Sequence, residues 1–241
     1  MINKLTDHTI VNLYEGSPLK KSVRIGKTIN VDGHELKYLL QFPRMKRGIN
    51  PRSRYPAILF LHGSTGEKYI DELIVGKHKD GLLQDHIDGS CEFPFYVIGP
   101  RIPDGICSWS IVSELVINAL DCAIAEYPID TDRIYLAGFS MGGCGVFDLA
   151  VKYPRKFAAL APSAGLTEDL DSLDKIKHIP MWIFYCRNDE IMPYSIGYGI
   201  ITKMMELNAN VILTVYPGKH SLEPTIYAEG TLSWFLMQRK R

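Results

Sequence analysis

Continuous apolar runs recur along this chain, and they limit how it can fold more than any other feature. In the clearest of them, Pro56 to Leu61, every residue is apolar. Runs without a polar face are typical of strands that are covered on both faces, as in parallel sheets. We therefore expect a buried, mostly parallel sheet, whose further strands are predicted at residues 93–99, 133–137, 157–161, 181–185 and 211–216.

Helix-like segments alternate with these strands, which indicates an α/β fold with helices on both faces of the sheet. The helices are predicted at residues 111–127, 142–152, 195–207 and 227–240. Near the N-terminus, residues 23–31 and 35–42 read as two strands joined by Asp32-Gly33, an Asp-Gly hairpin signal. No Gly/Ser linker divides the sequence, so residues 1–241 are expected to form one domain.

Charge and composition exclude several classes of function. The chain contains 27 Lys plus Arg and 27 Asp plus Glu, so its net charge is zero. This balance gives no electrostatic indication that it binds nucleic acid or an anionic membrane. No run approaches the length of a spanning helix, and Met1 to Glu15 lacks the pattern of a signal peptide. A cytoplasmic enzyme is the expectation, and a homo-oligomer is left open.

No metal or cofactor is indicated by the residues that commonly bind one. The 5 cysteines show no Cys-x-x-Cys spacing, which argues against a disulfide framework or a zinc site. His78 and His86 lie among aspartates, but their spacing matches no standard ligand set, so a solvated loop or helix is the simpler interpretation. We expect neither a metal nor another cofactor.

The segment Gly138-Phe139-Ser140-Met141-Gly142-Gly143 joins a predicted strand to a predicted helix. A Gly-x-Ser-x-Gly run in that context is the pattern of a nucleophile elbow, in which the serine occupies a sharp, strained turn. The residues two before and two after such a serine must be nearly free of side chain, and Gly138 and Gly142 meet that demand. Ser140 is therefore the candidate nucleophile, and the start of the next helix favours developing negative charge.

A serine nucleophile needs a base, and His220 is the best placed of the 7 histidines. It follows the last predicted strand by a short turn and so lies at the carboxyl edge of the sheet, as Ser140 does. Asp189, just after the strand 181–185, is the candidate acid that orients it. Glu190 and Asp174 remain the alternatives for the acid. The order Ser, Asp, His is that of the α/β-hydrolases.

The loop after the strand at Pro56 to Leu61 reads His62-Gly63-Ser64-Thr65-Gly66. Its glycines allow backbone N–H groups to approach a substrate oxygen. We assign one oxyanion donor to the amide of Ser64 and the other to the amide of Met141. His62 itself is interpreted as a structural residue that holds the loop.

The chain resembles an α/β-hydrolase esterase of the phospholipase/carboxylesterase and feruloyl-esterase-like group, related to dienelactone hydrolases, over about residues 35 to 240. One departure from that group is Tyr185-Cys186, where its members commonly carry His-Gly. The motifs that carry the resemblance are Tyr55-Pro56, His62-Gly63, Ile98-Gly99-Pro100, Asp132-Arg133-Ile134-Tyr135, Gly138 to Gly143, Tyr153-Pro154, Asp189 to Pro193 and Gly218-Lys219-His220.

The resemblance implies a serine esterase that acts through an acyl-enzyme on soluble or polymer-attached esters of short to medium or aryl acids. It also implies that residues 102–109 border the substrate pocket, where Trp109 could stack on an aromatic acyl group or instead fill a gap in the core. No room for a large lid is left between the strands at 157–161 and 181–185. The alternatives are a prolyl-oligopeptidase-type serine peptidase and a non-catalytic binding protein on a hydrolase fold.

Overall fold

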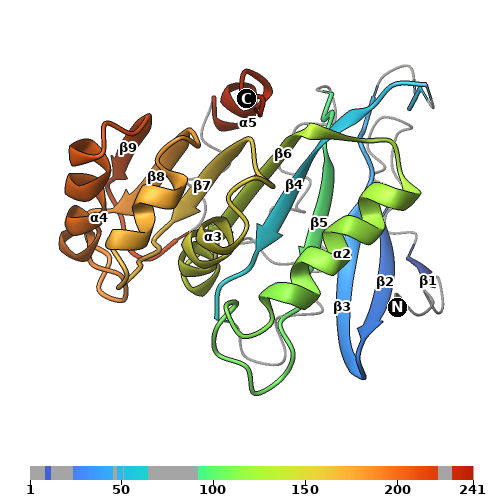
Figure 1. The fold of residues 1–241 in the computed structure, drawn as a ribbon, viewed down its shortest axis with the longest axis horizontal. Coiled ribbons are helices and arrows are strands. Elements are labelled where there is room, and N and C mark those ends of the chain that lie inside the picture. The colour runs from blue at the N-terminus through green and yellow to red at the C-terminus, as the bar shows by residue number, and fades with distance from the viewer. Residues whose placement is uncertain are drawn as a thin grey trace.

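The computed structural model describes residues 9–11, 24–45, 48–50, 52–64, 92–221 and 230–240, and its strands form a 9-stranded sheet. The strands lie in the order β1-β2-β3-β5-β4-β6-β7-β8-β9 (Figure 1). Their bounds are β1 Thr9–Val11, β2 Arg24–Val31, β3 His34–Gln41, β4 Tyr55–Leu61, β5 Tyr96–Pro100, β6 Ile129–Phe139, β7 Ala159–Ser163, β8 Met181–Cys186 and β9 Val211–Tyr216.

From β5 to β9 every neighbouring pair of strands is parallel, and the three N-terminal strands are antiparallel to their neighbours. The expected hairpin is confirmed: β2 pairs with β3 from Arg24–Gln41 to Val31–His34. Its two turn residues both have positive φ, 51° for Asp32 and 86° for Gly33, which is the conformation that favours Asp-Gly in such turns. The mostly parallel α/β architecture predicted from the apolar runs is therefore present.

The helices among the described residues are α2 Ser113–Glu126, α3 Met141–Lys152, α4 Tyr194–Glu206, α5 Thr231–Leu236 and a short 3-10 helix, η1 Asp171–Ile176. Figure 1 shows α2 and α3 across one face of the sheet and α5 near the opposite end of the strands from the loops that follow β4 and β5. The C-terminal helix is shorter than the predicted 227–240. It ends at Leu236, and the Lys240 N–H then donates to the carbonyl of Asp132 at 2.9 Å.

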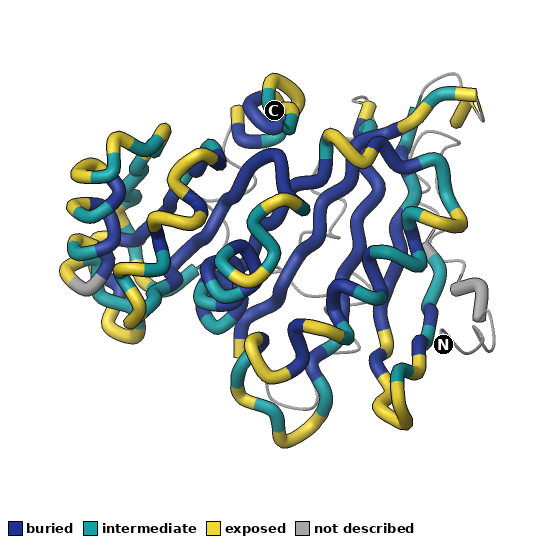
Figure 2. Tube along the Cα trace, viewed as in Figure 1, coloured by how far each residue is buried: buried dark blue, intermediate teal, exposed yellow. Residues whose placement is uncertain are grey.

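The buried residues form two clusters, one on each face of the sheet, and β4 contributes to both. Figure 2 shows β4 as buried along its length. Ala57, Leu59 and Leu61 belong to the cluster that includes side chains of α2, α3 and α4, whereas Ile58 and Phe60 belong to the cluster on the other side, with Trp234 and Phe235 of α5. Because successive residues of a strand point to opposite faces, a strand buried on both must be apolar throughout. This is the physical basis of the continuous runs.

A buried cation fastens the N-terminal hairpin to α2. The side chain of Lys27 in β2 has no exposed surface, pairs with Glu126 at the end of α2, and lies 4.8 Å from the centre of the Tyr127 ring. A buried ammonium requires such a partner, because desolvating a lone charge is costly. The hairpin is thereby joined to the α/β part of the chain by a specific contact as well as by strand pairing.

Candidate active site

Ser140 occupies the sharp turn between β6 and α3. Its φ of 56° and ψ of −120° lie in a region that residues with side chains seldom adopt, which marks a strained backbone. The turn is held on both sides: the Ser140 N–H donates to the carbonyl of Ser163 at 2.9 Å, and the Cys144 N–H donates to the carbonyl of Ser140 at 3.0 Å. Hydrogen bonds to β7 and α3 thus maintain the strain.

The two glycines that flank Ser140 are sterically required. A Cβ added to Gly138 would lie 2.3 Å from the Gly142 carbonyl oxygen, and one added to Gly142 would lie 1.9 Å from the Leu61 carbonyl oxygen. Both distances are far below van der Waals contact, and the obstacles are backbone atoms that cannot rotate away. The spacing of the Gly-x-Ser-x-Gly motif therefore follows from the close approach of α3 to β4 and β6.

Asp189 and His220 are brought together at the carboxyl ends of β8 and β9. The Asp189 side chain is fully buried, and its Oδ2 lies 2.6 Å from His220 Nδ1. Its Oδ1 accepts the backbone N–H groups of Ile191 and Met192 at 2.9 and 2.8 Å. Three donors thus fix the carboxylate, and the Nδ1–H tautomer of His220 is the one assigned by this network.

The two alternatives for the acid lie elsewhere. Glu190 is exposed, and no hydrogen bond joins it to His220 among the described residues. Asp174 lies in η1 and pairs with Lys177 at 2.8 Å. Of the three carboxylates, Asp189 is the one in contact with the imidazole.

The ring of His220 packs on the ring of Phe139, the residue that precedes Ser140. The two ring centroids are 4.6 Å apart and tilted by 36°. No hydrogen bond between Ser140 Oγ and His220 is formed in the described part of the chain. The structure thus places His220 in direct contact with Asp189 and against the residue that precedes Ser140.

Ser64 and Met141, the residues assigned to the oxyanion donors, line the same cleft as Ser140. Ser64 follows β4 and is exposed; Met141 is the first residue of α3, where backbone N–H groups have no partner within the helix. A Cβ on Gly63 would lie 3.2 Å from Ser140 Cβ, so the loop after β4 is in van der Waals contact with the serine turn. Thr65 and Gly66 lie outside the described residues.

His62 holds that loop through both ring nitrogens. Its Nε2 accepts the Ile102 N–H at 3.2 Å, so Nδ1 carries the proton and donates to the Gly63 carbonyl at 2.7 Å. Burial lowers the pKa of His62, and the charge of Arg101 adds to that lowering against the opposing effect of the Gly63 hydrogen bond. The neutral imidazole is therefore the favoured form, in keeping with its interpretation as a structural residue.

The structure places Trp109 in the core and not among the residues that line the cleft, so of the two roles left open for it the filling of a core gap is the one present, and its assignment as a substrate-binding residue is corrected. Its side chain has no exposed surface, and its Nε1–H donates to the His62 carbonyl at 3.1 Å. The indole meets the His62 ring edge to face, with centroids 5.0 Å apart. The physical reason is the gap that Gly145 leaves beside α3, where a Cβ would lie only 2.7 Å from Trp109 Cβ.

A cleft of about 540 Å³ opens beside Ser140. The segment that follows β5, which the sequence places at the border of the pocket, supplies one wall with Ile102, Ile106 and Ser108. Met192 and Cys144 also line the cleft although neither was predicted as a site residue; each lies within four residues of one. The complete lining consists of Ser64, Ile102, Gly105, Ile106, Cys107, Ser108, Ser140, Met141, Cys144 and Met192.

None of the described helices is both long enough and apolar enough to cross a bilayer. Within the described ranges, no group of three or more His, Cys, Asp or Glu side chains is arranged to hold a metal ion. His78 and His86, which lie among aspartates in the sequence, are outside these ranges.

The sequence profile of a family described as phospholipase/carboxylesterase matches residues 109–229, about half of the chain. The matched range includes Ser140, Asp189 and His220. A bifunctional acetylxylan esterase/xylanase of Neocallimastix patriciarum is 28% identical over 145 residues, which cover 56% of this chain and 21% of that protein. The chain thus spans about a fifth of the length of this relative.

Solved structures share the fold over most of the chain. A thermostable esterase superposes with a TM-score of 0.74 and 26% identity, covering 90% of this chain and 63% of that one. The feruloyl esterase module of Clostridium thermocellum, solved with sinapinate, superposes with a TM-score of 0.69 and 15% identity, covering 92% and 90% of the two chains. These likenesses confirm the expected α/β-hydrolase fold.

Proposed function

Because the chain belongs to the phospholipase/carboxylesterase family, we propose that it is a serine carboxylic-ester hydrolase that works through an acyl-enzyme. The observation that carries the proposal is the Asp189–His220 hydrogen bond of 2.6 Å beside the strained Ser140 turn. A buried carboxylate that holds an imidazole next to an elbow serine is the arrangement that activates a hydroxyl for acyl transfer.

In the first half of the reaction, Ser140 Oγ attacks the acyl carbonyl carbon while His220 Nε2 takes the hydroxyl proton. Asp189 accepts from Nδ1–H and stabilises the imidazolium that forms. The negative charge that develops on the carbonyl oxygen is stabilised by the amides of Ser64 and Met141, at the start of α3. His220 then gives its proton to the departing alcohol, which leaves the acyl group on Ser140.

In the second half, water replaces the alcohol. His220 takes a proton from the water as its oxygen attacks the acyl-enzyme carbonyl, and the same amides hold the second oxyanion. The collapse of this intermediate returns the proton to Ser140 Oγ and releases the acid. Every proton transfer uses His220, so the removal of either Asp189 or His220 affects both halves.

The cleft supports esters of short to medium or aryl acids, soluble or attached to a polymer, as the substrate class. Its volume of about 540 Å³ lies in the range of small-molecule sites, and Ile102, Ile106 and Met192 give it apolar walls for an acyl chain or ring. Residues 164–180, which join β7 to β8, hold η1 but no longer helix, so that connection adds no large lid. The names acetylxylan esterase and feruloyl esterase among the relatives agree with this class.

The test is covalent labelling by a fluorophosphonate probe together with hydrolysis of acetyl, butyryl, feruloyl and long-chain aryl esters. Ser140→Ala should abolish labelling and lower kcat by on the order of a millionfold. Ser163→Ala is the matched control, because this buried hydroxyl has no hydrogen-bond partner among the described residues and should not be the labelled group. Retention of labelling in Ser140→Ala, or cleavage of peptide amides but not esters, would overturn the proposal.

A further inference from the structure

Trp109 lies between the two segments that carry the proposed oxyanion donors. On one side its Nε1–H donates to the carbonyl of His62, two residues before Ser64. On the other side its Cβ, Cγ and Cδ1 atoms occupy the space where a side chain on Gly145 of α3 would be, since a Cβ added there would lie 2.7 to 2.9 Å from them. A rigid, fully buried ring therefore fills the space between the loop after β4 and the second turn of α3.

The same loop and helix also touch directly, near the reacting serine. A Cβ added to Gly142 would lie 2.7 Å from the carbonyl oxygen of His62, the atom that accepts the Trp109 N–H. The position of this carbonyl is thus fixed by the α3 backbone on one side and by the indole on the other. Met141, the second donor residue, directly precedes Gly142.

His62 extends the contact to the wall of the cleft. Its ring packs edge to face on Trp109, its Nε2 accepts the Ile102 N–H, and its Nδ1–H donates to Gly63. A shift of the indole would therefore move the loop that bears Ser64 relative to Met141. The nucleophile itself is held by different contacts, its hydrogen bonds to Ser163 and Cys144.

We infer that Trp109 is a positioning residue that sets the separation of the two oxyanion donors, the amides of Ser64 and Met141. This inference rests on the proposed ester hydrolysis. Donors must lie about 2.7 to 3.1 Å from the oxyanion to be effective, and a misplacement of about 1 Å can cost on the order of a hundredfold in rate. A residue outside the cleft can thus control the chemical step.

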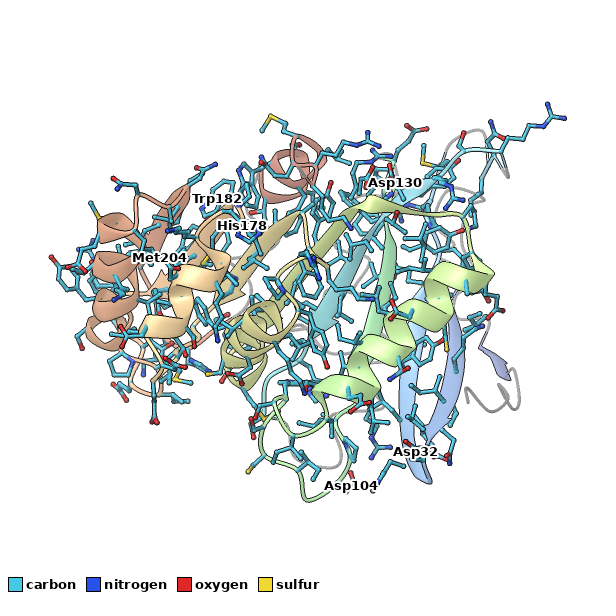
Figure 3. All side chains as sticks on the ribbon, in the orientation of Figure 1. Asp32, Asp104, Asp130, His178, Trp182 and Met204 are labelled. Carbon is cyan, nitrogen blue, oxygen red and sulfur yellow. The ribbon has the colours of Figure 1, made fainter. Side chains whose placement is uncertain are left out.

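The test compares Trp109→Phe with Trp182→Phe. The first keeps a ring in the gap but removes the N–H that binds the His62 carbonyl. The control removes an equivalent indole hydrogen bond, from Trp182 Nε1 to Thr214 Oγ1 at 2.8 Å. Trp182 lies near the end of the sheet opposite to the loop of Asp104, which follows β5 (Figure 3).

Rates are measured on an oxoester and on the matching thionoester, normalised to fluorophosphonate-titrated sites so that unfolded protein does not count. Sulfur is a poor acceptor, so the oxoester-to-thionoester ratio reports the oxyanion donors. Trp109→Phe should lower kcat for the oxoester by about 10- to 100-fold with little change in KM, and should lower the ratio. Trp182→Phe should leave both unchanged.

An equal loss on both esters, or a wild-type ratio in Trp109→Phe, would show a purely structural role. If Trp109→Phe cannot be purified folded, Gly145→Ala is used in its place. The added Cβ displaces the indole but keeps its N–H. Gly145→Ala should then show the same lower kcat on the oxoester and the same lower oxoester-to-thionoester ratio. Failure of the proposed function is recognised separately, since wild-type protein would then hydrolyse neither ester in a Ser140-dependent way.

Discussion

The imidazole of His220 and the buried carboxylate of Asp189 are joined by a 2.6 Å contact between Nδ1 and Oδ2. The carboxylate is also held by the backbone amides of Ile191 and Met192, so it cannot turn away from the imidazole without losing two further hydrogen bonds. The contact fixes which nitrogen of His220 carries the proton. Nε2 is then the nitrogen able to accept a proton from Ser140.

Asp189→Asn should test this relationship. The amide can present an N–H to Nδ1, which favours the wrong tautomer and leaves the fold nearly intact. We expect kcat/KM for an aryl acetate to fall by about 10⁴-fold. Glu190→Gln, one residue along, changes an exposed carboxylate and should keep nearly full activity. The prediction is wrong if the two variants lose activity equally.

Gly142→Ala should disrupt the contact between α3 and the end of β4. The added Cβ would be 1.9 Å from the Leu61 carbonyl oxygen, so the backbone must shift, at a cost of about 3 kcal/mol in unfolding free energy. For a chain of this size, this lowers Tm by roughly 6 to 12 °C.

Gly199→Ala is the matched control for that substitution. Its Cβ would meet only Leu170 Cδ1 at 3.7 Å, an ordinary contact, and it lies inside α4. Because alanine is a better helix former than glycine, this variant should be more stable than the wild type by about 0.5 to 1 kcal/mol. Thermal unfolding of the two variants would contradict the steric argument if both moved Tm in the same direction.

The stability of the fold should decrease as the pH falls below about 6.5. Burial lowers the pKa of His62 in the folded state below its ordinary value of 6.5, so the unfolded chain binds the proton more readily. The folded state therefore loses stability from about pH 6.5 downward, through the lower pKa of the folded state. Protonation of Nε2 also removes the acceptor for the Ile102 N–H.

His62→Gln should flatten this part of the dependence of Tm on pH, because it cannot titrate. The two proteins contain the same carboxylates, so the difference between the two curves reports His62. His178→Gln changes an exposed imidazole and should follow the wild-type curve. A wild-type slope in His62→Gln between about pH 7.5 and 5 would remove His62 as the cause.

Ile106→Trp should narrow the cleft. Ile106 lines its wall, and the larger ring would occupy space that an aromatic acyl group needs. We expect kcat/KM for a feruloyl ester to fall on the order of tenfold or more relative to that for an acetyl ester. Ile111→Trp is the control: Ile111 is 63% exposed and is not among the residues that line the cleft, so the ratio should not change.

Most of the sheet could be predicted from the sequence, because a strand that is buried on both faces is apolar at every position. Elements whose boundaries depend on partners far away in the sequence could not be predicted in this way. β6 begins at Ile129, before the predicted start at 133, because Tyr55 of β4 pairs with Ile129. β1 is only 3 residues long and owes its assignment to pairing with β2, which no local pattern reveals.

The candidate site likewise has a part that could be predicted from the sequence and a part that could not. Ser140, Asp189 and His220 follow strand ends, so a topology of parallel strands places them at one edge. The motif glycines could be recognised from their spacing around Ser140, although the atoms that exclude a side chain at Gly142 belong to Leu61 and His62 of a distant segment. The orientation of Trp109 could not be predicted, because it depends on Gly145, far along the chain, leaving room for the indole. Whether a tryptophan faces the cleft or the core is decided by such long-range packing.

The loops after β8 and β9 are joined by more than the His220–Asp189 contact. The Arg187 N–H donates to the Tyr216 carbonyl at 2.7 Å, and the Asn188 N–H donates to the Gly218 carbonyl at 2.9 Å. Asp189 and His220 are therefore joined by backbone as well as side-chain hydrogen bonds between their loops, while Ser140 is held by hydrogen bonds to β7 and α3. Any relative motion of these two parts should then change the distance between Ser140 and His220, whereas Asp189 should move together with His220.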